Sequence, residues 1–437
     1  MNRRTFLRAG SAAAVTLVIT AAADERATTP RSFAPGEPLA VYADGTARIN
    51  ALLSASLNVA IPAGIYMISG ALDVRDGHVI SAASAGQVTL KAAASYTGAI
   101  VVTSDKSFTL SGLTLDGACA DRMSSEGAID AALVRVSGGS NVTLENNRFQ
   151  YAPSFAIWTW RSASMQVRGN TFLECWHPIR MDGSNLPSGI IENNTFQNTA
   201  AFKSIQHIEA IGTVDLIVRG NTMRGAGLGE PTAHGYEGTW GNSIYIWNST
   251  GHLIEANKVY ANYWSAVVSG AGATNGVIRN NYFSDGPNTG CAVWIEQAGA
   301  AYMSVDSNQM DGSIEVGDSG GDHCTITNNT IRSRNYGINV NAAAKDVLIQ
   351  GNRISSKAGR RFSYGVYLWQ KNTPDVNVRV FDNSIQGFDK GIAINNMGST
   401  GTVYGIALSG NTFANNNTNV WIPRHIDTRY LTEPINR

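Results

Sequence analysis

Two acidic residues on neighbouring segments are the side chains best placed to do chemistry. Asp182 and Glu209 each lie in a short segment that alternates apolar and polar residues, as a half-buried β-strand does. If the segments belong to consecutive coils of a solenoid, their backbones lie about 5 Å apart, and the carboxyl groups could approach the roughly 5–5.5 Å seen in retaining glycosidases. Two carboxyl groups that close cannot both ionise easily, so one of them keeps its proton and can act as an acid.

Charged residues flank this acid pair. Arg180 precedes Asp182 by two residues and His207 precedes Glu209 by two, so all four are expected on one face. Arg180 is expected to hold Asp182 ionised and His207 to tune Glu209, although Arg180 and Asp182 could also form an ordinary surface ion network. Glu296 lies three coils beyond Glu209, roughly 14 Å away at the same spacing, which suits a subsite residue better than a catalytic partner.

Aromatic residues crowd the same expected face. They are Trp158, Trp160, Tyr245, Trp247, Trp294, Tyr367 and Trp369. Aromatic rings in an open groove present flat apolar surfaces to sugar rings, while polar groups beside them fix the orientation. The face therefore predicts a groove that binds a sugar chain. The alternative is that loops fold over the rings and make a secondary core.

A glycine-rich insertion from Gly225 to Gly241 is expected to wall this groove, because loops on a rigid scaffold commonly carry function. Its candidate substrate-binding residues are His234, Tyr236 and Glu237. A surface loop that is merely tolerated is the alternative.

A repeated phrase shows which elements position these residues. An apolar/polar alternation is followed by Asn, one variable residue and an apolar residue, in eleven copies that are 21 to 36 residues apart. The asparagines are Asn147, Asn170, Asn194, Asn221, Asn257, Asn281, Asn308, Asn329, Asn352, Asn383 and Asn411. Asn tolerates the left-handed backbone of a corner, and its amide can bond to the Asn one coil away. Parallel strands joined by tight corners require a solenoid, because no segment has the period of a crossover helix.

The predicted fold is therefore all-β, a single-stranded right-handed parallel β-helix with a short N-terminal capping helix over Ile49–Ser56. We expect a signal peptide at 1–23, an N-terminal segment and cap at 24–57, the β-helix at 58–422 and a C-terminal tail or cap at 423–437. One row of apolar residues sets the inward register of the strands that carry the site. This row is Ile157, Ile179, Ile208, Ile244, Val267, Val293, Ile314, Ile338, Val366 and Ile392.

The N-terminus and the composition indicate an exported protein. Arg3 and Arg4 precede an apolar run from Ala9 to Ala23, as in a twin-arginine signal peptide, and no later run is long enough to span a membrane. The formal net charge is +0 and only 15% of residues are charged, which argues against a nucleic-acid binder. The four cysteines lie scattered over many coils, so we expect buried filler and no zinc site.

Several phrases carry a family resemblance. The string Asp-Gly-Thr from Asp44, the Ile-Pro-Ala-Gly string from Ile61 and the Asn-x-Phe coils together resemble the pectin-lyase-like β-helix superfamily over about residues 40 to 420. The resemblance implies carbohydrate chemistry, although fold does not fix function. The catalytic strings of pectate lyases, polygalacturonases and uronate epimerases are absent, and the nearest approach, Trp176 to Arg180, matches none of them. No catalytic residue can therefore be transferred by motif.

These observations favour a periplasmic or secreted enzyme that degrades a polysaccharide or oligosaccharide, a glycoside hydrolase or transglycosylase without a cofactor. A polysaccharide lyase is the alternative, with Arg180, His207, Tyr236 or Tyr245 as the base and a Ca²⁺ ion held by Asp182 and Glu209. The excess of acids over cations on the expected face argues against it. A non-catalytic glycan-binding or surface-structural protein is the third interpretation. The sugar and the oligomeric state are left open.

Overall fold

The computed structural model describes the chain except at both ends and in ten short stretches. The described residues are 39–121, 128–183, 187–199, 204–227, 241–284, 291–317, 320–342, 344–357, 362–370, 377–396 and 405–422. The expected signal peptide, the C-terminal tail and the loop residues 228–240, which include His234, Tyr236 and Glu237, lie outside these residues.

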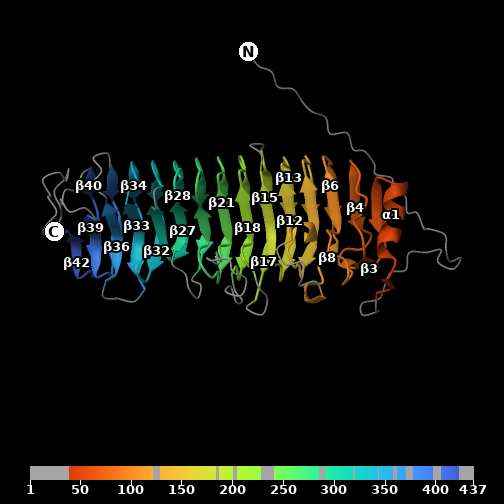
Figure 1. The fold of residues 1–437 in the computed structure, drawn as a ribbon. Coiled ribbons are helices and arrows are strands. Elements are labelled where there is room, and N and C mark those ends of the chain that lie inside the picture. Colours follow the sequence, from red (N-terminus) through yellow and green to blue (C-terminus); the bar gives the residue numbers. More distant parts are fainter. Residues whose placement is uncertain are drawn as a thin grey trace, which may run out of the picture.

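Three parallel sheets of 15, 14 and 13 strands run the length of the molecule. We call them sheets A, B and C. From β4 onward each coil passes from a strand of sheet B to one of sheet A and then one of sheet C, so the strands stack into the long prism of Figure 1. This is the predicted right-handed parallel β-helix.

The strands are short, as the spacing of the repeat requires. Sheet A contains β1 (Val41–Tyr42), β3 (Gly64–Ile68), β5 (Val88–Ala92), β8 (Thr114–Asp116), β11 (Arg148–Gln150), β14 (Thr171–Leu173), β17 (Thr195–Gln197), β20 (Thr222–Arg224), β23 (Lys258–Tyr260), β26 (Tyr282–Phe283), β29 (Gln309–Asp311), β32 (Thr330–Ser333), β35 (Arg353–Ser356), β38 (Ser384–Gln386) and β41 (Thr412–Ala414). Sheet B contains β2 (Asn58–Ile61), β4 (His78–Ala82), β7 (Phe108–Ser111), β10 (Thr143–Glu145), β13 (Met165–Arg168), β16 (Gly189–Glu192), β19 (Ile217–Arg219), β22 (Leu253–Glu255), β25 (Val277–Arg279), β28 (Ser304–Asp306), β31 (Thr325–Thr327), β34 (Val347–Gln350), β37 (Val378–Phe381) and β40 (Ile406–Ser409). Sheet C contains β6 (Val101–Ser104), β9 (Val134–Ser137), β12 (Phe155–Trp160), β15 (His177–Asp182), β18 (Ile208–Ile211), β21 (Ile244–Trp247), β24 (Val267–Ser269), β27 (Cys291–Glu296), β30 (Ser313–Gly317), β33 (Tyr336–Ala342), β36 (Tyr364–Gln370), β39 (Lys390–Asn396) and β42 (Thr418–Trp421).

The N-terminal end is capped by helix α1 (Gly45–Ala55), seen at one end of Figure 1. Ile49 and Leu53 are buried on its inner face. The helix begins one turn before the predicted Ile49, because its first turn is polar and carries no apolar periodicity. There the Arg48 Nε donates to the Asp44 Oδ1 at 2.8 Å. Two short 3₁₀ turns, η1 (Cys119–Asp121) and η3 (Ile129–Ala131), lie between sheets A and C.

The predicted inward row of sheet C is confirmed. Its ten residues are fully buried and pair in register from Ile157 to Ile392. The four cysteines are buried, as expected. Because the inward row is fixed, every residue one position after it projects outward from sheet C.

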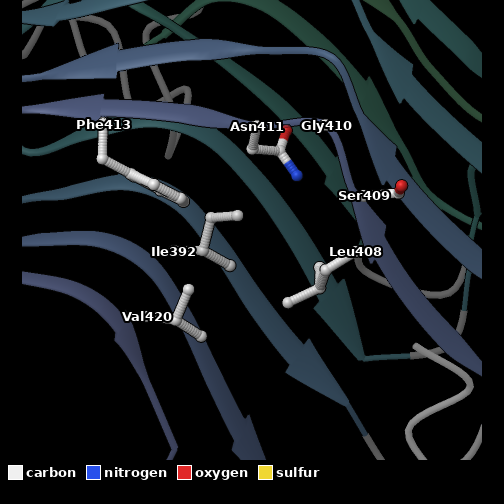
Figure 2. Close-up of a pocket in the computed structure, with 7 residues that line it drawn as sticks. All are labelled: Ile392, Leu408, Ser409, Gly410, Asn411, Phe413 and Val420. Carbon is white, nitrogen blue, oxygen red and sulfur yellow. The ribbon is translucent and has the colours of Figure 1, made fainter. Parts of the chain in front are cut away.

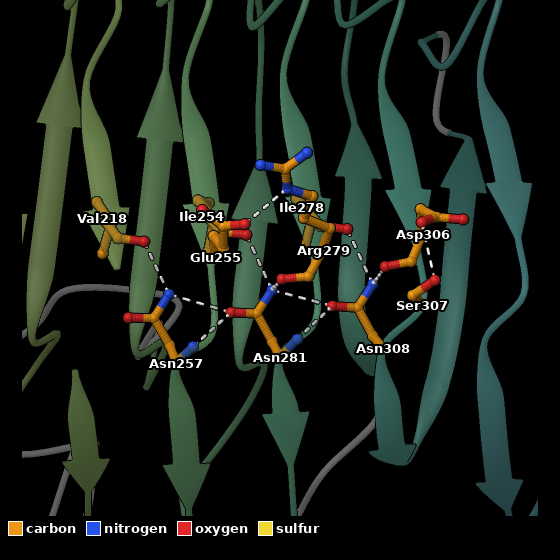
Figure 3. Close-up of polar contacts among 10 residues, drawn as sticks. All are labelled: Val218, Ile254, Glu255, Asn257, Ile278, Arg279, Asn281, Asp306, Ser307 and Asn308. Carbon is orange, nitrogen blue, oxygen red and sulfur yellow. Dashed lines mark hydrogen bonds and ion pairs between the residues drawn. The ribbon is translucent and has the colours of Figure 1, made fainter. Parts of the chain in front are cut away.

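The repeated asparagines form a ladder at the corner between sheets B and A, shown for three of them in Figure 3. The Oδ1 of Asn281 accepts bonds from the backbone N–H of Asn257 at 2.9 Å and its Nδ2 at 3.0 Å. The Asn281 Nδ2 donates in turn to the Asn308 Oδ1 at 2.9 Å. The expected amide-to-amide bonding is therefore confirmed.

We predicted that the asparagine takes the left-handed backbone of this corner. In the structure the residue before it does so. These residues, with φ between 54° and 67°, are Asn146, Gly169, Asn193, Gly220, Ala256, Asn280, Ser307, Asn328, Gly351, Asp382 and Gly410. The ladder asparagine has to aim its amide along the helix axis, and the bend is made one residue earlier. Asn, Asp and Gly dominate at that bend because they enter the left-handed region most easily.

The corner between sheets B and A has a constant length. From β7 onward it always consists of two residues. The corners that differ in length from coil to coil are therefore the two that border sheet C, so the surroundings of sheet C are the variable part of the molecule.

A small pocket lies among apolar residues at the C-terminal end of the β-helix. Ile392, Leu408, Phe413 and Val420 line this pocket, shown in Figure 2, and β40, β41 and β42 are the last strands of their sheets. Unpaired strand edges need a cover. The segment expected to provide it, 423–437, lies outside the described residues.

Candidate functional site

One outward row of sheet C carries the candidate site. Trp158, Arg180, Glu209 and Tyr245 occupy neighbouring register positions on β12, β15, β18 and β21. The expectation that Asp182 and Glu209 match in register is wrong, because Glu209 pairs with Arg180 and Asp182 pairs with Ile211. Aligning Ile179 with Ile208 already requires this offset, since the next residue on each strand is Arg180 and Glu209.

Arg180 joins the two acids that the sequence singled out. Its Nε lies 3.1 Å from both carboxylate oxygens of Asp182, and its Nη1 lies 3.2 Å from the Oε2 of Glu209. The indole Nε1 of Trp158 also donates to the Asp182 Oδ2 at 2.8 Å. Trp158, Asp182, Arg180 and Glu209 therefore form one bonded chain across three strands, which we call the site tetrad.

The tetrad is partly withdrawn from solvent. The Arg180 and Asp182 side chains are 30% and 20% exposed, and that of Glu209 is 13% exposed. Burial raises the pKa of Glu209, Arg180 lowers it and Asp182 raises it again. The net direction for Glu209 is upward, so its surroundings favour the protonated form of this carboxyl group.

His207 does not lie beside Glu209 on the outer face, contrary to expectation. It is fully buried and its ring centroid lies 5.4 Å from that of Phe196. Burial lowers the pKa of His207 to about 3. Strand β18 begins only at Ile208, so the alternation that places Glu209 outward does not extend back to His207.

A different histidine lies next to Glu209. His177 is buried, and its Nε2 lies 3.8 Å from the Glu209 Oε2. Two residues before Ile179, it has the inward parity of the strand, so the alternation alone does not indicate a place beside Glu209. The proximity comes from its place at the start of β15, where the chain enters the sheet.

Tyr245 and Glu296 were predicted to face open solvent, but both are buried. Burial raises the pKa of Tyr245, and the charges of Glu296 and Glu209 raise it further. The Tyr245 hydroxyl lies 3.4 Å from the point where a Cβ of Gly270 would stand, so the ring packs against the backbone at Gly270. Here the alternative interpretation, a covered aromatic surface, holds.

Other aromatic residues remain open on either side of the tetrad. Trp160 and Trp247 are 45% and 39% exposed, while Trp158 and Trp294 are half-buried. Trp264, which the pattern missed because it precedes its strand, is 37% exposed, with its ring centroid 6.4 Å from that of Trp294. Together these rings line the outer face of sheet C along several coils.

Tyr367 and Trp369 lie apart from this group. Their strand, β36, is the sixth after β18, roughly 30 Å along the axis at the usual strand spacing. There Tyr367 packs against Tyr336 and Tyr364, with ring centroids 5.5 and 4.8 Å apart. The structure therefore does not place these two aromatics with the tetrad.

A family model matches part of the chain. Residues 97–293 match the NosD family, described as a periplasmic copper-binding protein. Copper is held by groups of imidazole, thiolate or thioether ligands. No group of three or more His, Cys, Asp or Glu side chains that could hold a metal ion occurs among the residues that the structure describes. The site tetrad does not fit copper either, because its carboxylates already bind a guanidinium.

Solved structures share the architecture at low sequence identity. A tailspike protein of E. coli bacteriophage HK620 is 12% identical, with a TM-score of 0.56, over 86% of this chain and 76% of that chain. Another structure of this tailspike, in complex with a pentasaccharide, has a TM-score of 0.52 at 12% identity, over 86% of this chain and 75% of that chain. The A-module of a mannuronan C-5 epimerase from Azotobacter vinelandii is 18% identical, with a TM-score of 0.42, over 88% of this chain and 93% of that chain.

None of the curated proteins compared with the chain matches it. In the described part of the chain, no helix has the length and apolar character that a membrane span requires. The three sheets, their parallel register and the matching solved structures together define the fold. The chain is a right-handed parallel β-helix.

Proposed function

We propose that this protein is exported to the periplasm or beyond and acts there on a polysaccharide or oligosaccharide, as a glycoside hydrolase or transglycosylase. The observation that carries the proposal is the site tetrad, in which one arginine binds two carboxyl groups from adjacent coils beside a tryptophan ring. The periplasmic description of the matched family and the pentasaccharide complex of the similar tailspike support the compartment and the class of ligand.

The chemistry follows from the two carboxyl groups. In glycoside hydrolysis a carboxylic acid protonates the glycosidic oxygen as the C–O bond breaks, and a carboxylate stabilises or attacks the sugar carbon, directly or through water. Asp182 and Glu209 are the proposed pair. Arg180 keeps them in one place and prevents both from remaining uncompensated charges in a half-buried site.

The open tryptophans are the proposed sugar-binding surfaces. Trp158 and Trp160 lie one strand before Arg180 and Asp182, while Trp247 and Trp294 lie on strands beyond Glu209. A glycan along the helix axis would therefore contact aromatic rings on both sides of the carboxyl pair. Tyr367 and Trp369 would contact only a much longer glycan. His234, Tyr236 and Glu237 remain proposed wall residues, and the buried Tyr245, Glu296 and His207 are proposed to support the site from beneath.

A lyase is the weaker candidate. It needs a base beside a neutralised uronate, but His207 is buried and burial raises the pKa of Tyr245, so neither is a ready base near neutral pH. A Ca²⁺ ion between Asp182 and Glu209 would have to displace the guanidinium of Arg180. The tetrad therefore favours hydrolysis or transfer.

The products formed from a panel of glycans test the proposal. The purified mature protein is incubated with neutral, amino-sugar and uronate polysaccharides, and the products are followed by reducing-end release and by ultraviolet absorbance. We expect new reducing ends or transglycosylation products from a neutral glycan without ultraviolet absorbance. Absorbance from a new double bond would establish the lyase, and binding without any turnover would establish a non-catalytic glycan-binding protein.

A further inference from the structure

The two carboxyl groups of the tetrad have different surroundings. Asp182 is surrounded by donors, since Arg180 binds both of its oxygens and Trp158 donates to one of them at 2.8 Å. Glu209 has one such donor, the Arg180 Nη1 at 3.2 Å, and its other near neighbour is the imidazole of His177.

The imidazole of His177 is neutral and its free nitrogen lies toward Glu209. Burial, followed by the charge of Arg180, lowers the pKa of His177 to about 3. Its Nε2 is buried and has no hydrogen-bond partner. We assign the proton of the neutral ring to Nδ1 and leave Nε2 as the acceptor, since the backbone at Ile179 raises the pKa of His177 as an acceptor of a ring N–H does. The Nε2 that lies 3.8 Å from the Glu209 Oε2 therefore carries a lone pair.

A lone pair at this position distinguishes the two protonation states of Glu209. An ionised Glu209 has nothing to donate to Nε2, so lone pairs face each other across the gap. A protonated Glu209 can donate its O–H to Nε2 after a small approach, which satisfies a buried acceptor that otherwise has no partner. We propose that His177 is a positioning residue that holds Glu209 in its protonated form, so that Glu209 is the acid of the pair and Asp182 the ionised carboxylate. This assignment of roles rests on the proposed function.

Some of the other groups that face Glu209 favour its ionised form and others its protonated form. Arg180 on β15 favours the ionised form, while the charge of Asp182 on the same strand opposes it. Tyr245 on β21, the register neighbour of Glu209, is itself buried and protonated, and so brings no charge. His177 adds an acceptor to this balance and therefore shifts it toward the protonated acid.

In this assignment Glu209 transfers its proton as the glycosidic bond breaks. The O–H bond of Glu209 breaks as its proton moves to the glycosidic oxygen, and the electron pair of the C–O bond leaves with that oxygen as an alcohol. The carboxylate left on Glu209 is then stabilised by Arg180, which already lies 3.2 Å away. Water that completes the hydrolysis returns a proton to Glu209.

Carbon-13 NMR of the glutamate side-chain carboxyls tests the role of His177 without any substrate. The full-length mature protein is labelled at the glutamate δ-carbon, and the Glu209 resonance is identified by its loss in Glu209→Gln. We expect the pKa of Glu209 to fall by about half a pH unit or more in His177→Phe, because one neutral hydrogen bond of typical strength is lost. His177→Gln, whose side-chain oxygen can accept the same bond, should restore most of the wild-type value.

A matched control and the contrary results complete the experiment. His252→Phe removes another buried imidazole, which directly precedes β22 of sheet B, and should leave the pKa of Glu209 unchanged. A Glu209 pKa that stays constant or rises in His177→Phe overturns the inference. If that variant does not fold, a pKa in His177→Gln more than half a pH unit below the wild-type value overturns it as well. The product assay on the glycan panel does not depend on this titration. A negative product assay therefore rejects the proposed function, whereas a contrary titration rejects the role of His177.

Discussion

Arg180 shows how far residue types and spacing can be interpreted without coordinates. The sequence correctly placed it beside Asp182, because residues two apart on a strand share a face. It could not show that the guanidinium also reaches Glu209 on the next strand, since that contact depends on the side-chain conformation. His177 was missed for a related reason, because inward parity does not exclude a contact with an outward residue at the start of a strand.

The left-handed corner gives a prediction at the same scale. Ala256 has a φ of 54°, where four other coils place glycine, and an L-residue in this region costs about 1–2 kcal/mol. Ala256→Gly should raise the free energy of unfolding by up to about 1 kcal/mol, since part of the gain is lost to the greater freedom of glycine in the unfolded chain. Urea denaturation measures the change.

The control for this substitution is the same change in ordinary strand backbone. Ala60 lies within β2, so Ala60→Gly should lower the free energy of unfolding by about 0.5–1 kcal/mol. If Ala256→Gly destabilises the protein as much as Ala60→Gly does, the left-handed strain at the corner is not relieved by glycine.

The elements of the solenoid were predictable because each coil must place an asparagine at the corner and apolar residues in the core. The asparagine phrase and the apolar alternation gave the strand register of sheet C residue by residue from Ile157 to Ile392. The start of α1 was missed because a polar first turn leaves no pattern. The burial of Tyr245 and Glu296 was missed because alternation shows which way a side chain points but not what covers it.

The asparagine ladder gives a prediction for how much the bonds between neighbouring coils contribute to the free energy of unfolding. Asn281 accepts two hydrogen bonds from Asn257 and donates to the carbonyl of Ile254 at 2.9 Å and to Asn308. Asn281→Ala leaves several of these buried groups without a partner, at about 1–3 kcal/mol for each group. We expect the free energy of unfolding to fall by roughly 3 kcal/mol or more, as measured by denaturant titration.

The end of the ladder supplies the matched control. Asn411 accepts bonds from Asn383, but it is half-buried in the last coil, where water can replace lost partners. Asn411→Ala should therefore cost clearly less than Asn281→Ala. Equal losses at both positions would show that ladder bonding inside the core is worth no more than bonding at the open end.

At the scale of the whole molecule, the β-helix separates constant from variable surface. The corner between sheets B and A keeps two residues per turn from β7 onward, while the corners on both sides of sheet C differ in length. The outward face of sheet C lies between these variable corners and carries open tryptophans around an arginine-linked acid pair. On such a face a function can change without loss of the scaffold. The fold was therefore predictable from repetition, whereas the chemistry depends on side chains that occur only once.

The central claim is that the tetrad catalyses glycan cleavage, and its most direct test is the rate of product release in two matched variants. Glu209 and Glu192 are both acids bound to an arginine, with side chains 13% and 16% exposed, but Glu192 lies on sheet B. On the best glycan of the panel, Glu209→Gln should lower the rate about a hundredfold to ten-thousandfold, as the loss of an acid catalyst does. Glu192→Gln should leave it near the wild-type value. Wild-type activity in a folded Glu209→Gln variant would contradict the account.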